Sequence, residues 1–569
     1  MRRPLSMIAT AMAVAVVASG CTLLGVGPWG NDQTDAQTQV QQTQQPTEQP
    51  TEQPSTQQSS SQPRSTDAPA TIDPNDVPVA SYDKSKHAVW PNAPTAPDRR
   101  QVASSATPEG FANPPAGQGM DRYLNQRITW TDCQGGMQCG TVLVPLDWDQ
   151  VDGQAITLKM KKRPASGDKQ GTMFINPGGP GGSGQDYVDG FDASGFPGYD
   201  IIGWDTRGAG ASTPVVCASN EQMDKYNAAD ISPDDDQEFN ALGNAQKEFA
   251  DWCREKSGGL LDHISTIDTV RDLDYLRHLV GDQHLTYLGV SYGTFIGSVY
   301  AELYPKRAGR LVLDSAVNIT DKETVIQAMG FDLALKEFGA WCAKNSECPY
   351  GDSQDAVVKN LTDWFADLDQ NPIKGATQTL TQNDGVLGVA SFLYSGEQAY
   401  ESLMNSLRFA REGNEPRFLL LAAGWLKGKD ENGNYGSLAF SFPAIACADS
   451  TDEGAAEVRP DWDKAKKLAP IFGTYMGPGM QCTYWTAKPM DQLKLTGTGA
   501  PPILVLGATG DPATPYEQAQ WMAEQLDSGV LVTWKGAGHG VYSLGNECAK
   551  KAVQDFVNKN TVPADGLTC

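Results

Sequence analysis

The feature that most restricts the fold of this chain is the pentapeptide Gly289-Val-Ser-Tyr-Gly293. An apolar run rich in β-formers precedes it at 285–290, and a helical pattern follows at 294–304. A strand, a sharp turn and a helix in this order form a nucleophile elbow, which lifts a serine hydroxyl above a parallel sheet. A G-x-S-x-G pentapeptide alone is weak evidence, because a serine in a plain structural turn would also fit it. Its structural context makes Ser291 the candidate nucleophile.

Strand and helix patterns alternate on both sides of this elbow. We expect an antiparallel opening pair and then four further strands, at 139–148, 155–163, 172–176, 199–204, 285–290 and 310–314. From about 322 to 476 the patterns are almost wholly helical, and the strand–helix alternation returns at 502–507 and 530–534.

The economical interpretation of these patterns is an α/β fold with a mostly parallel sheet. A helical cap interrupts this sheet domain after the sixth strand. We place the two parts of the sheet domain at 76–317 and 499–569, and the cap at 318–498.

A catalytic serine needs a base within hydrogen-bond reach and a carboxylate that fixes the tautomer of that base. With a nucleophile elbow the chain order is serine, acid and histidine, on loops after successive late strands. Asp511 follows the strand at 502–507, and His539 follows the strand at 530–534 in a glycine-rich loop. The other four histidines all precede the elbow. We therefore expect Asp511 and His539 to complete a triad, with helix capping as the alternative role for Asp511.

The loop Asn176-Pro-Gly-Gly-Pro-Gly-Gly-Ser-Gly184 follows the third expected strand. Its glycines let bare backbone approach a substrate carbonyl, so we expect the N–H of Gly178 or Gly179 to join that of Tyr292 in an oxyanion hole. A phosphate-binding loop is excluded, because no Gly-Lys-Ser/Thr follows and no dinucleotide spacing fits. A flexible loop without function is the plain alternative.

The N-terminus has the features of an export signal. A basic start and a short apolar run end in Val17-Ala-Ser-Gly-Cys21, which predicts a signal peptide at 1–20 and lipidation of Cys21. An ordinary secretory signal with an incidental cysteine is the alternative. Residues 21–75, rich in Gln, Thr, Ser and Pro, are expected to form a disordered tether. We expect an extracytoplasmic protein that contacts the membrane only through this lipid.

Ten of the eleven cysteines remain when Cys21 is set aside. They lie in neighbouring pairs along the chain, for which we predict five sequential disulfides: Cys133 with Cys139, Cys217 with Cys253, Cys342 with Cys348, Cys447 with Cys482, and Cys548 with Cys569.

The cysteines lack zinc-type spacing, so we expect no metal, and we expect no cofactor. The net charge of −25 argues against nucleic acid as a partner. The sequence does not fix the oligomeric state, and we expect a monomer.

These motifs, with the turn Trp204-Asp-Thr-Arg-Gly-Ala-Gly-Ala-Ser-Thr-Pro214 and the segment Gly510-Asp-Pro-Ala-Thr-Pro515, give the chain a family resemblance. From about residue 120 to the C-terminus it resembles the secreted actinomycete tripeptidyl aminopeptidases, which are α/β-hydrolases related to the proline iminopeptidases. The resemblance implies a serine exopeptidase that releases short peptides from free N-termini, with Ser291, Asp511 and His539 as its triad. Mycobacterial cell-envelope members of this group are also described as carboxylesterases or envelope proteases, so a carboxylesterase or a serine endoprotease remains the alternative. A peptide or a small ester is the expected substrate.

An aminopeptidase also needs a carboxylate that captures the ammonium group of its substrate. Asp449, close to Cys447 in the helical insertion, is the candidate, and a solvated surface carboxylate is the alternative. We expect Arg207 to hold its own turn in place. A non-catalytic tethered binding protein is a third hypothesis, but it would not require Ser291, Asp511 and His539 in this order.

Overall fold

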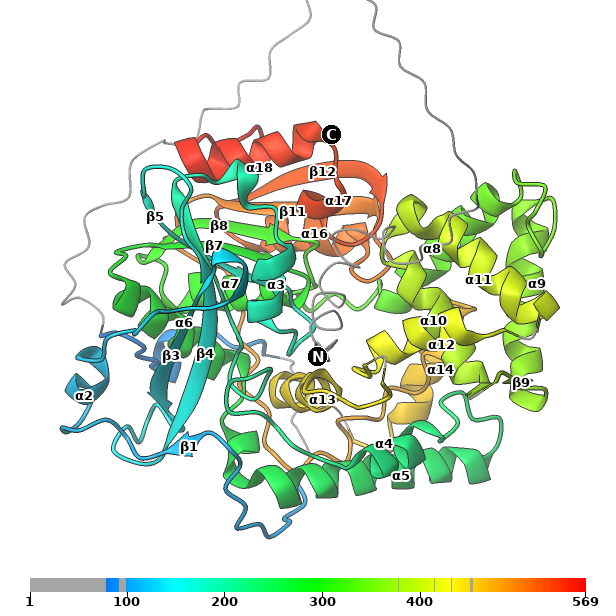
Figure 1. The fold of residues 1–569 in the computed structure, drawn as a ribbon, viewed down its shortest axis with the longest axis horizontal. Coiled ribbons are helices and arrows are strands. Elements are labelled where there is room, and N and C mark those ends of the chain that lie inside the picture. Colours follow the sequence, from blue (N-terminus) through cyan, green and yellow to red (C-terminus); the bar gives the residue numbers. More distant parts are fainter. Residues whose placement is uncertain (1–77, 92–98, 377, 414, 431, 451–453) are drawn as a thin grey trace, which may run out of the picture.

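The fold is that of a computed structural model, which describes residues 78–91, 99–376, 378–413, 415–430, 432–450 and 454–569. The signal peptide, Cys21 and the whole tether expected at 21–75 lie outside these residues. Figure 1 shows a central sheet with helices on both faces and a group of helices, mostly yellow-green, to one side.

An eleven-stranded sheet runs through the molecule in the order β13-β12-β11-β8-β7-β5-β6-β4-β3-β2, and β1 pairs with β4. The strands are β1 (Phe111–Ala112), β2 (Thr131–Asp132), β3 (Gln138–Pro145), β4 (Ala155–Arg163), β5 (Gly171–Asn176), β6 (Tyr199–Trp204), β7 (Leu285–Val290), β8 (Ala308–Asp314), β11 (Ile503–Gly510), β12 (Gly529–Ala537) and β13 (Leu567–Thr568). Strands β5 to β8 and β11 to β13 pair in parallel, whereas β3 and β4 form the expected antiparallel pair. The predicted α/β class with a mostly parallel sheet is confirmed.

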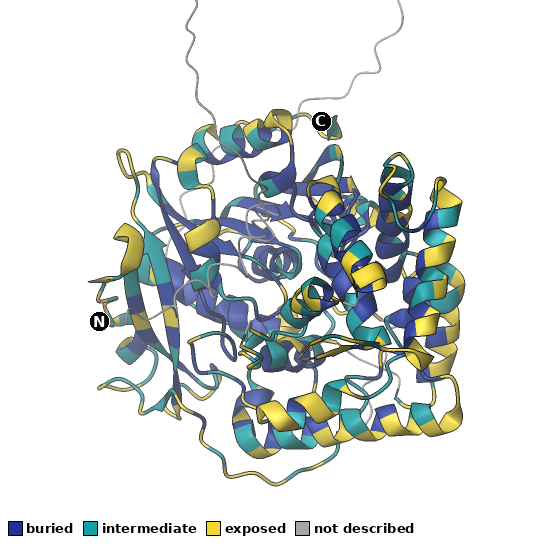
Figure 2. Cartoon of the chain, turned by 45° about the vertical axis from the view of Figure 1, so that its right-hand side comes forward, coloured by how far each residue is buried: buried dark blue, intermediate teal, exposed yellow. Residues whose placement is uncertain are grey.

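Successive residues of the central strands face opposite sides of the sheet, as strand geometry requires. Leu288, Val312 and Leu504 belong to one hydrophobic cluster, whereas their neighbours Tyr287 and Leu313 belong to the other. Burial on both faces explains why β7 is a continuous apolar run rather than an alternating one. Figure 2 accordingly shows the central strands mostly in dark blue and the outer sides of the helices in yellow.

The helices of the sheet domain are α2 (Asp121–Leu124), α3 (Gly184–Gly190), α4 (Asn220–Asn227), α5 (Asp236–Ser257), α6 (Thr266–Val280), α7 (Tyr292–Leu303), α16 (Tyr516–Gln525), α17 (Val541–Leu544) and α18 (Glu547–Lys559). Helices α3 and α18 contribute to the cluster on one face, and α6, α7 and α16 to the cluster on the other. Helix α6 is buried along most of its length. It ends at Gly281, whose φ of 86° forms a left-handed C-cap.

Between β8 and β11 the chain is almost entirely helical, with α8 (Gln327–Cys342), α9 (Gln354–Gln370), α10 (Gln382–Leu393), α11 (Tyr400–Gly413), α12 (Arg417–Leu426), α13 (Leu438–Asp449), α14 (Val458–Leu468) and α15 (Phe472–Tyr475). A small hairpin of β9 (Ile373–Lys374) and β10 (Thr379–Leu380) interrupts them. Helices α8 to α12, together with α15, bury a hydrophobic cluster of their own. We call residues 318–498 the cap.

Helices α4 and α5 lie between β6 and α6, where helical periodicity was expected, but their contact with the cap was not foreseen from the sequence. Although they precede the elbow in the chain, Leu242 of α5 clusters with Val458 and Met480 of the cap. Figure 1 shows α4 and α5 running below the cap helices. The segment after β6 therefore supports the cap from beneath.

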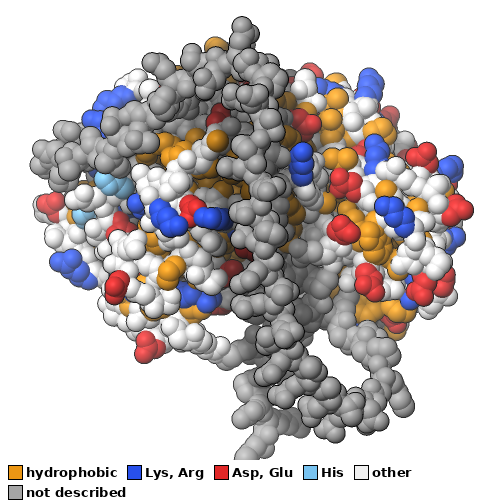
Figure 3. All heavy atoms as spheres, turned by 90° about the horizontal axis from the view of Figure 1, so that it is seen from above, with side chains coloured by type: hydrophobic (Ala, Val, Ile, Leu, Met, Phe, Trp, Pro, Cys, Tyr) orange, Lys and Arg blue, Asp and Glu red, His pale blue; other side chains and the backbone are white. Residues whose placement is uncertain are grey.

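Acidic and basic side chains are interspersed over the cap side of the face drawn in Figure 3. Every helix in the described ranges is too short or too polar to cross a bilayer.

Five disulfides join the ten cysteines in sequential order. Their sequence separations range from 6 to 36 residues. Cys447–Cys482 fixes the end of α13 to the irregular segment that leads back to the sheet domain.

Candidate active site

Ser291 lies between the end of β7 and the start of α7, in a strained conformation with φ 59° and ψ −126°. A positive φ is uncommon for a residue with a side chain and marks a backbone that the surrounding fold enforces. The Ser291 side chain makes no capping hydrogen bond to α7, while its N–H donates to the Asp314 carbonyl at 2.9 Å. The geometry therefore fits an elbow that presents a free hydroxyl, and a helix-capping role does not account for this serine.

The two glycines of the pentapeptide are required by close backbone contacts. A Cβ at Gly289 would lie 2.3 Å from the Gly293 carbonyl oxygen, and one at Gly293 would lie 3.0 Å from the Asn176 carbonyl oxygen. Helix α7 consequently begins in contact with both β7 and the glycine-rich loop after β5, as an elbow demands.

Asp511 and His539 form a buried pair at the ends of β11 and β12. The Nδ1 of His539 lies 2.9 and 3.0 Å from the two Asp511 carboxylate oxygens. His539 is 4% exposed and Asp511 is 1% exposed. Oδ1 of Asp511 also accepts the N–H groups of Ala513 and Thr514 at 2.9 Å. Because Nδ1 is held by the carboxylate, the Nε2 atom remains to exchange a proton with a nucleophile.

Charge around His539 favours its protonated form. Burial alone would lower the pKa of His539, but the carboxylates of Asp511 and, more weakly, Asp314 outweigh it and raise the pKa above its ordinary value. Asp314 itself is fully buried, and this burial raises the pKa of its carboxyl to about 6. An imidazole surrounded in this way can accept a proton and hold the resulting positive charge.

The end of β8 connects the serine to the histidine loop. The backbone carbonyl of Asp314 accepts a hydrogen bond from the Ser291 N–H. The Asp314 carboxylate accepts the N–H groups of Val541 and Tyr542 at 2.7 and 2.8 Å. The N–H of Gly540 donates to the Ser315 hydroxyl at 2.8 Å. Among the described residues, Ser291 and His539 share no direct hydrogen bond. Such contacts often tighten only when substrate binds.

The glycine-rich loop after β5 packs against the elbow. A Cβ at Gly178 would lie 2.5 Å from the Val290 carbonyl oxygen and 3.0 Å from the Tyr292 nitrogen. The N–H of Tyr292 has no acceptor within its helix, since Tyr292 is the first residue of α7. The sequence left Gly178 and Gly179 open as the second oxyanion donor. The N–H of Gly178 already donates to Asn176 Oδ1 at 2.9 Å, which favours Gly179 as the candidate donor.

The cap touches every loop that carries a candidate catalytic group. The carbonyl of Tyr394 accepts the His539 N–H at 2.8 Å, and its ring meets the imidazole edge-on at 5.5 Å. Ser441 of α13 contacts Gly181 of the glycine-rich loop, and Gly330 of α8 packs on the backbone at Asp511. The cap thus bounds the site on several sides.

Asp449 lies next to the elbow, but its contacts differ from the substrate-ammonium role expected for it. Oδ1 accepts the Thr266 N–H at 2.7 Å, and Oδ2 accepts the hydroxyls of Thr266 and Tyr292 at 2.7 and 2.5 Å. Only 5% of the residue is exposed. Because both carboxylate oxygens already bind protein donors, Asp449 has little capacity left for a substrate amine.

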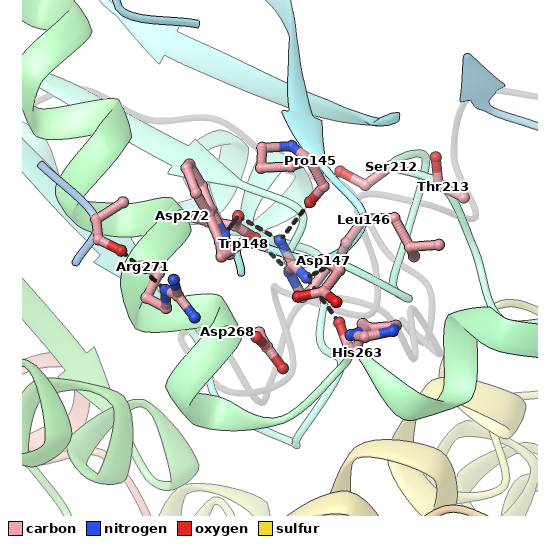
Figure 4. A network of polar contacts seen from close by, with 12 residues as sticks. Pro145, Leu146, Asp147, Trp148, Ser212, Thr213, His263, Asp268, Arg271 and Asp272 are labelled. Carbon is pink, nitrogen blue, oxygen red and sulfur yellow. Dashed lines mark hydrogen bonds and ion pairs between the residues drawn. The ribbon is translucent and has the colours of Figure 1, made fainter. Parts of the chain in front are cut away.

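Arg207 holds its own turn, as expected from the sequence. Its guanidinium makes two 2.7 Å hydrogen bonds to the Asp272 carboxylate and further bonds to the carbonyls of Leu146 and His263. Both side chains are fully buried. Figure 4 labels the partners of this guanidinium, among them Asp272, Leu146 and His263. The indole N–H of Trp148 donates to the same Asp272 carboxylate at 2.9 Å. Arg207 is therefore structural and does not face a substrate.

Two residues at the site were missed by the sequence analysis. Asp314 ends a strand without any motif, so only the fold shows that it holds the histidine loop. Thr514, three residues after Asp511, donates its hydroxyl to the Ser315 carbonyl and lies 3.3 Å from His539 Nδ1. From the sequence, Thr514-Pro515 is interpreted as the N-cap and first turn of the following helix; in the structure α16 begins at Tyr516, with Pro515 as its N-cap. In the part of the chain that the structure describes, no group of three His, Cys, Asp or Glu side chains could hold a metal ion.

The elbow, the sheet and the acid–base pair together define a serine hydrolase of the α/β-hydrolase fold. Two family models match the chain, one described as alpha/beta hydrolase fold at residues 171–423 and one described as TAP-like protein at 469–569. The chain belongs to the α/β-hydrolase family, in its tripeptidyl-aminopeptidase-like group.

Relatives named as a serine protease, a tripeptidyl aminopeptidase and a carboxylesterase support this placement. The Mycobacterium tuberculosis protein named serine protease Hip1 is 33% identical over 479 residues, which cover 78% of this chain and 91% of the relative. The Streptomyces coelicolor tripeptidyl aminopeptidase is 30% identical over 79% of this chain and 87% of its own. Carboxylesterase B of Mycobacterium tuberculosis is 30% identical over 76% and 86%. The chain is thus similar to peptidases and to an esterase at almost the same level.

Proposed function

We propose that this serine hydrolase is an exopeptidase that releases short peptides from free N-termini through an acyl-enzyme on Ser291. The observation that carries the proposal is the contact of the cap with the glycine-rich loop at Gly181 and with the two loops that carry Asp511 and His539. A site enclosed in this way admits the end of a peptide more readily than the middle of a long chain. The named tripeptidyl aminopeptidase relative supports the same assignment.

In the proposed mechanism, Ser291 Oγ attacks the scissile carbonyl while Nε2 of His539 takes its proton. Asp511 stabilises the imidazolium that forms, through its bond to Nδ1. The N–H groups of Tyr292 and Gly179 hold the developing oxyanion. His539 then gives the proton to the leaving amine, and water hydrolyses the acyl-enzyme through the same base.

Three reporters test the proposal: a free-amine tripeptide amide with a chromogenic leaving group, its N-acetylated twin, and a short acyl ester. We expect the wild-type protein to cleave the free-amine tripeptide at least about 100-fold better than the acetylated twin, and the Ser291→Ala variant to cleave neither. A phosphonate that titrates Ser291 normalises each rate to active sites. Equal cleavage of the acetylated peptide would overturn the exopeptidase assignment in favour of an endoprotease, and preference for the ester would favour a carboxylesterase.

We further propose that the protein acts outside the cytoplasm, anchored by a lipid on Cys21. The five disulfides support an oxidising compartment, because such bonds rarely persist in a reducing cytosol. The Cys21→Ala variant should move from the membrane fraction to the soluble extracellular fraction, and intact mass should show the loss of acyl chains. An unlipidated wild-type protein in the medium would instead establish an ordinary secretory signal.

A further inference from the structure

One contact joins the cap to the turn that carries Ser291. Asp449 is the last residue of cap helix α13, Tyr292 is the first residue of α7, and Thr266 is the first residue of α6. The Asp449 carboxylate accepts hydrogen bonds from both of the other residues, and the two hydroxyls also contact each other. We call these three residues the Asp449 cluster. The triad and the proposed oxyanion donors account for none of these side-chain contacts.

The cluster is built to hold a buried anion. Thr266 N–H belongs to the positive end of the fifteen-residue helix α6, which favours a carboxylate at this position. Burial raises the pKa of the Asp449 carboxyl to about 6, and the hydrogen bonds from Tyr292 and Thr266 oppose this rise by stabilising the ionised form. Asp268, on the first turn of α6, is a further carboxylate close enough to contribute to that rise. Hydrogen bonds to an ionised acceptor are shorter and stronger than those between neutral groups.

Asp449 is held from the side of the cap as well. Cys447 is bonded to Cys482, the Met490 N–H donates to the Ala448 carbonyl at 2.7 Å, and the Gln492 amide donates to the Asp449 carbonyl at 2.6 Å. The carboxylate is therefore fixed in space before substrate arrives, and the Tyr292 hydroxyl binds to a rigid support.

We propose that Asp449 is a positioning residue that fixes the Tyr292 side chain and thereby the N–H of Tyr292 in the oxyanion hole. Tyr292 directly follows Ser291, whose backbone is strained. A turn under strain relaxes unless its surroundings restrain it, and the Asp449–Tyr292 bond supplies such a restraint across 157 residues of sequence. This inference rests on Ser291 as the nucleophile of the proposed function, but it does not depend on whether the substrate is a peptide or an ester.

A double-mutant cycle on Asp449→Asn and Tyr292→Phe tests the proposal. Both variants keep the backbone N–H, and Tyr292→Phe keeps the ring. Because an oxyanion donor acts in the transition state, we expect each single variant to lower kcat per titrated active site about 10- to 100-fold. KM should stay within about threefold. The double variant should be no slower than the slower single one, since both remove the same contact.

Tyr300→Phe is the matched control. Tyr300 lies on the same helix, and its hydroxyl also donates to a buried aspartate, Asp274, at 3.1 Å. We expect it to lower the melting temperature without changing kcat per active site. A kcat within about threefold of wild type in both cluster variants would overturn the proposal. Multiplicative losses in the double variant, or an equal loss of kcat in Tyr300→Phe, would also overturn it.

Two further comparisons keep the test decisive. If Asp449→Asn does not fold, Thr266→Val and Thr266→Ser replace it: the serine variant keeps both donors and should retain wild-type kcat, whereas the valine variant should lower it. If Asp449 instead binds the substrate amine, its variant raises KM for the free-amine tripeptide alone. Failure of the exopeptidase assignment would appear separately, in the reporter preference of the wild-type protein.

Discussion

The glycine-rich loop after β5 allows a quantitative test of the oxyanion hole, through Gly178→Ala. Gly178 has a φ of 88°, and an added Cβ would lie 2.5 Å from the Val290 carbonyl oxygen. A carbon and a carbonyl oxygen normally approach no closer than about 3.3 Å, so the loop must move by roughly 0.8 Å. This displacement would carry the adjacent Gly179 N–H out of hydrogen-bond range of an oxyanion.

The expected loss of activity in Gly178→Ala can be estimated from the position of this loop beside the reacting groups. Losing one oxyanion donor costs about 10²- to 10³-fold in kcat, and a misplacement of about 1 Å near reacting groups costs about 10²-fold. We therefore expect kcat/KM of Gly178→Ala to fall about 100-fold, or about 2.7 kcal/mol of transition-state stabilisation. The left-handed backbone adds a separate loss of about 1–2 kcal/mol in folding stability.

Gly281→Ala separates these two effects. Gly281 has a φ of 86°, and an added Cβ there would have no heavy atom within 4 Å. This variant should show the backbone loss of about 1–2 kcal/mol without the added clash, and should keep kcat/KM within about twofold of wild type. Rates per titrated active site and thermal unfolding of both variants provide the measurement. A folded Gly178→Ala enzyme within threefold of wild-type activity would refute the assignment of this loop to the oxyanion hole.

Two further predictions concern the acid–base pair and the buried ion pair. Asp511→Asn should reduce kcat about 10⁴-fold. It should also shift the acid limb of the kcat/KM–pH profile to lower pH, because the Asp511 charge is what holds the His539 pKa above its ordinary value against burial; an unmoved limb would contradict this. Asp272→Asn leaves a buried guanidinium on Arg207 without its partner and should cost about 3–5 kcal/mol of unfolding free energy. As a comparison, Asp262 is bidentate to a different arginine, Arg254, and its side chain is 44% exposed. Asp262→Asn should therefore cost less than about 1 kcal/mol; equal losses in denaturant unfolding would show that burial does not set the difference.

The sequence already contained the class of the fold and the order of the triad candidates. The strand, turn and helix around Ser291 are local signals, carried by a buried apolar run and two closely spaced glycines. Asp511 and His539 could be found because each follows a late strand, and parallel strands bring their carboxyl ends to one edge of the sheet. The same locality explains the disulfides, which join neighbouring cysteines in the chain.

The tertiary structure decided what the side chains do once they meet. The hydrogen bond from the Gly178 N–H to Asn176 is a tertiary feature that favours Gly179 over Gly178 as the candidate oxyanion donor. The position of α4 and α5 beneath the cap depends on the apolar contacts of Leu242. Asp449 meets Thr266 across 183 residues of sequence. No periodicity or spacing records such a contact, because it forms only when the cap and the sheet domain pack together. The sequence therefore identified the candidate catalytic groups, and the packing of the cap on the sheet domain determined how they are held.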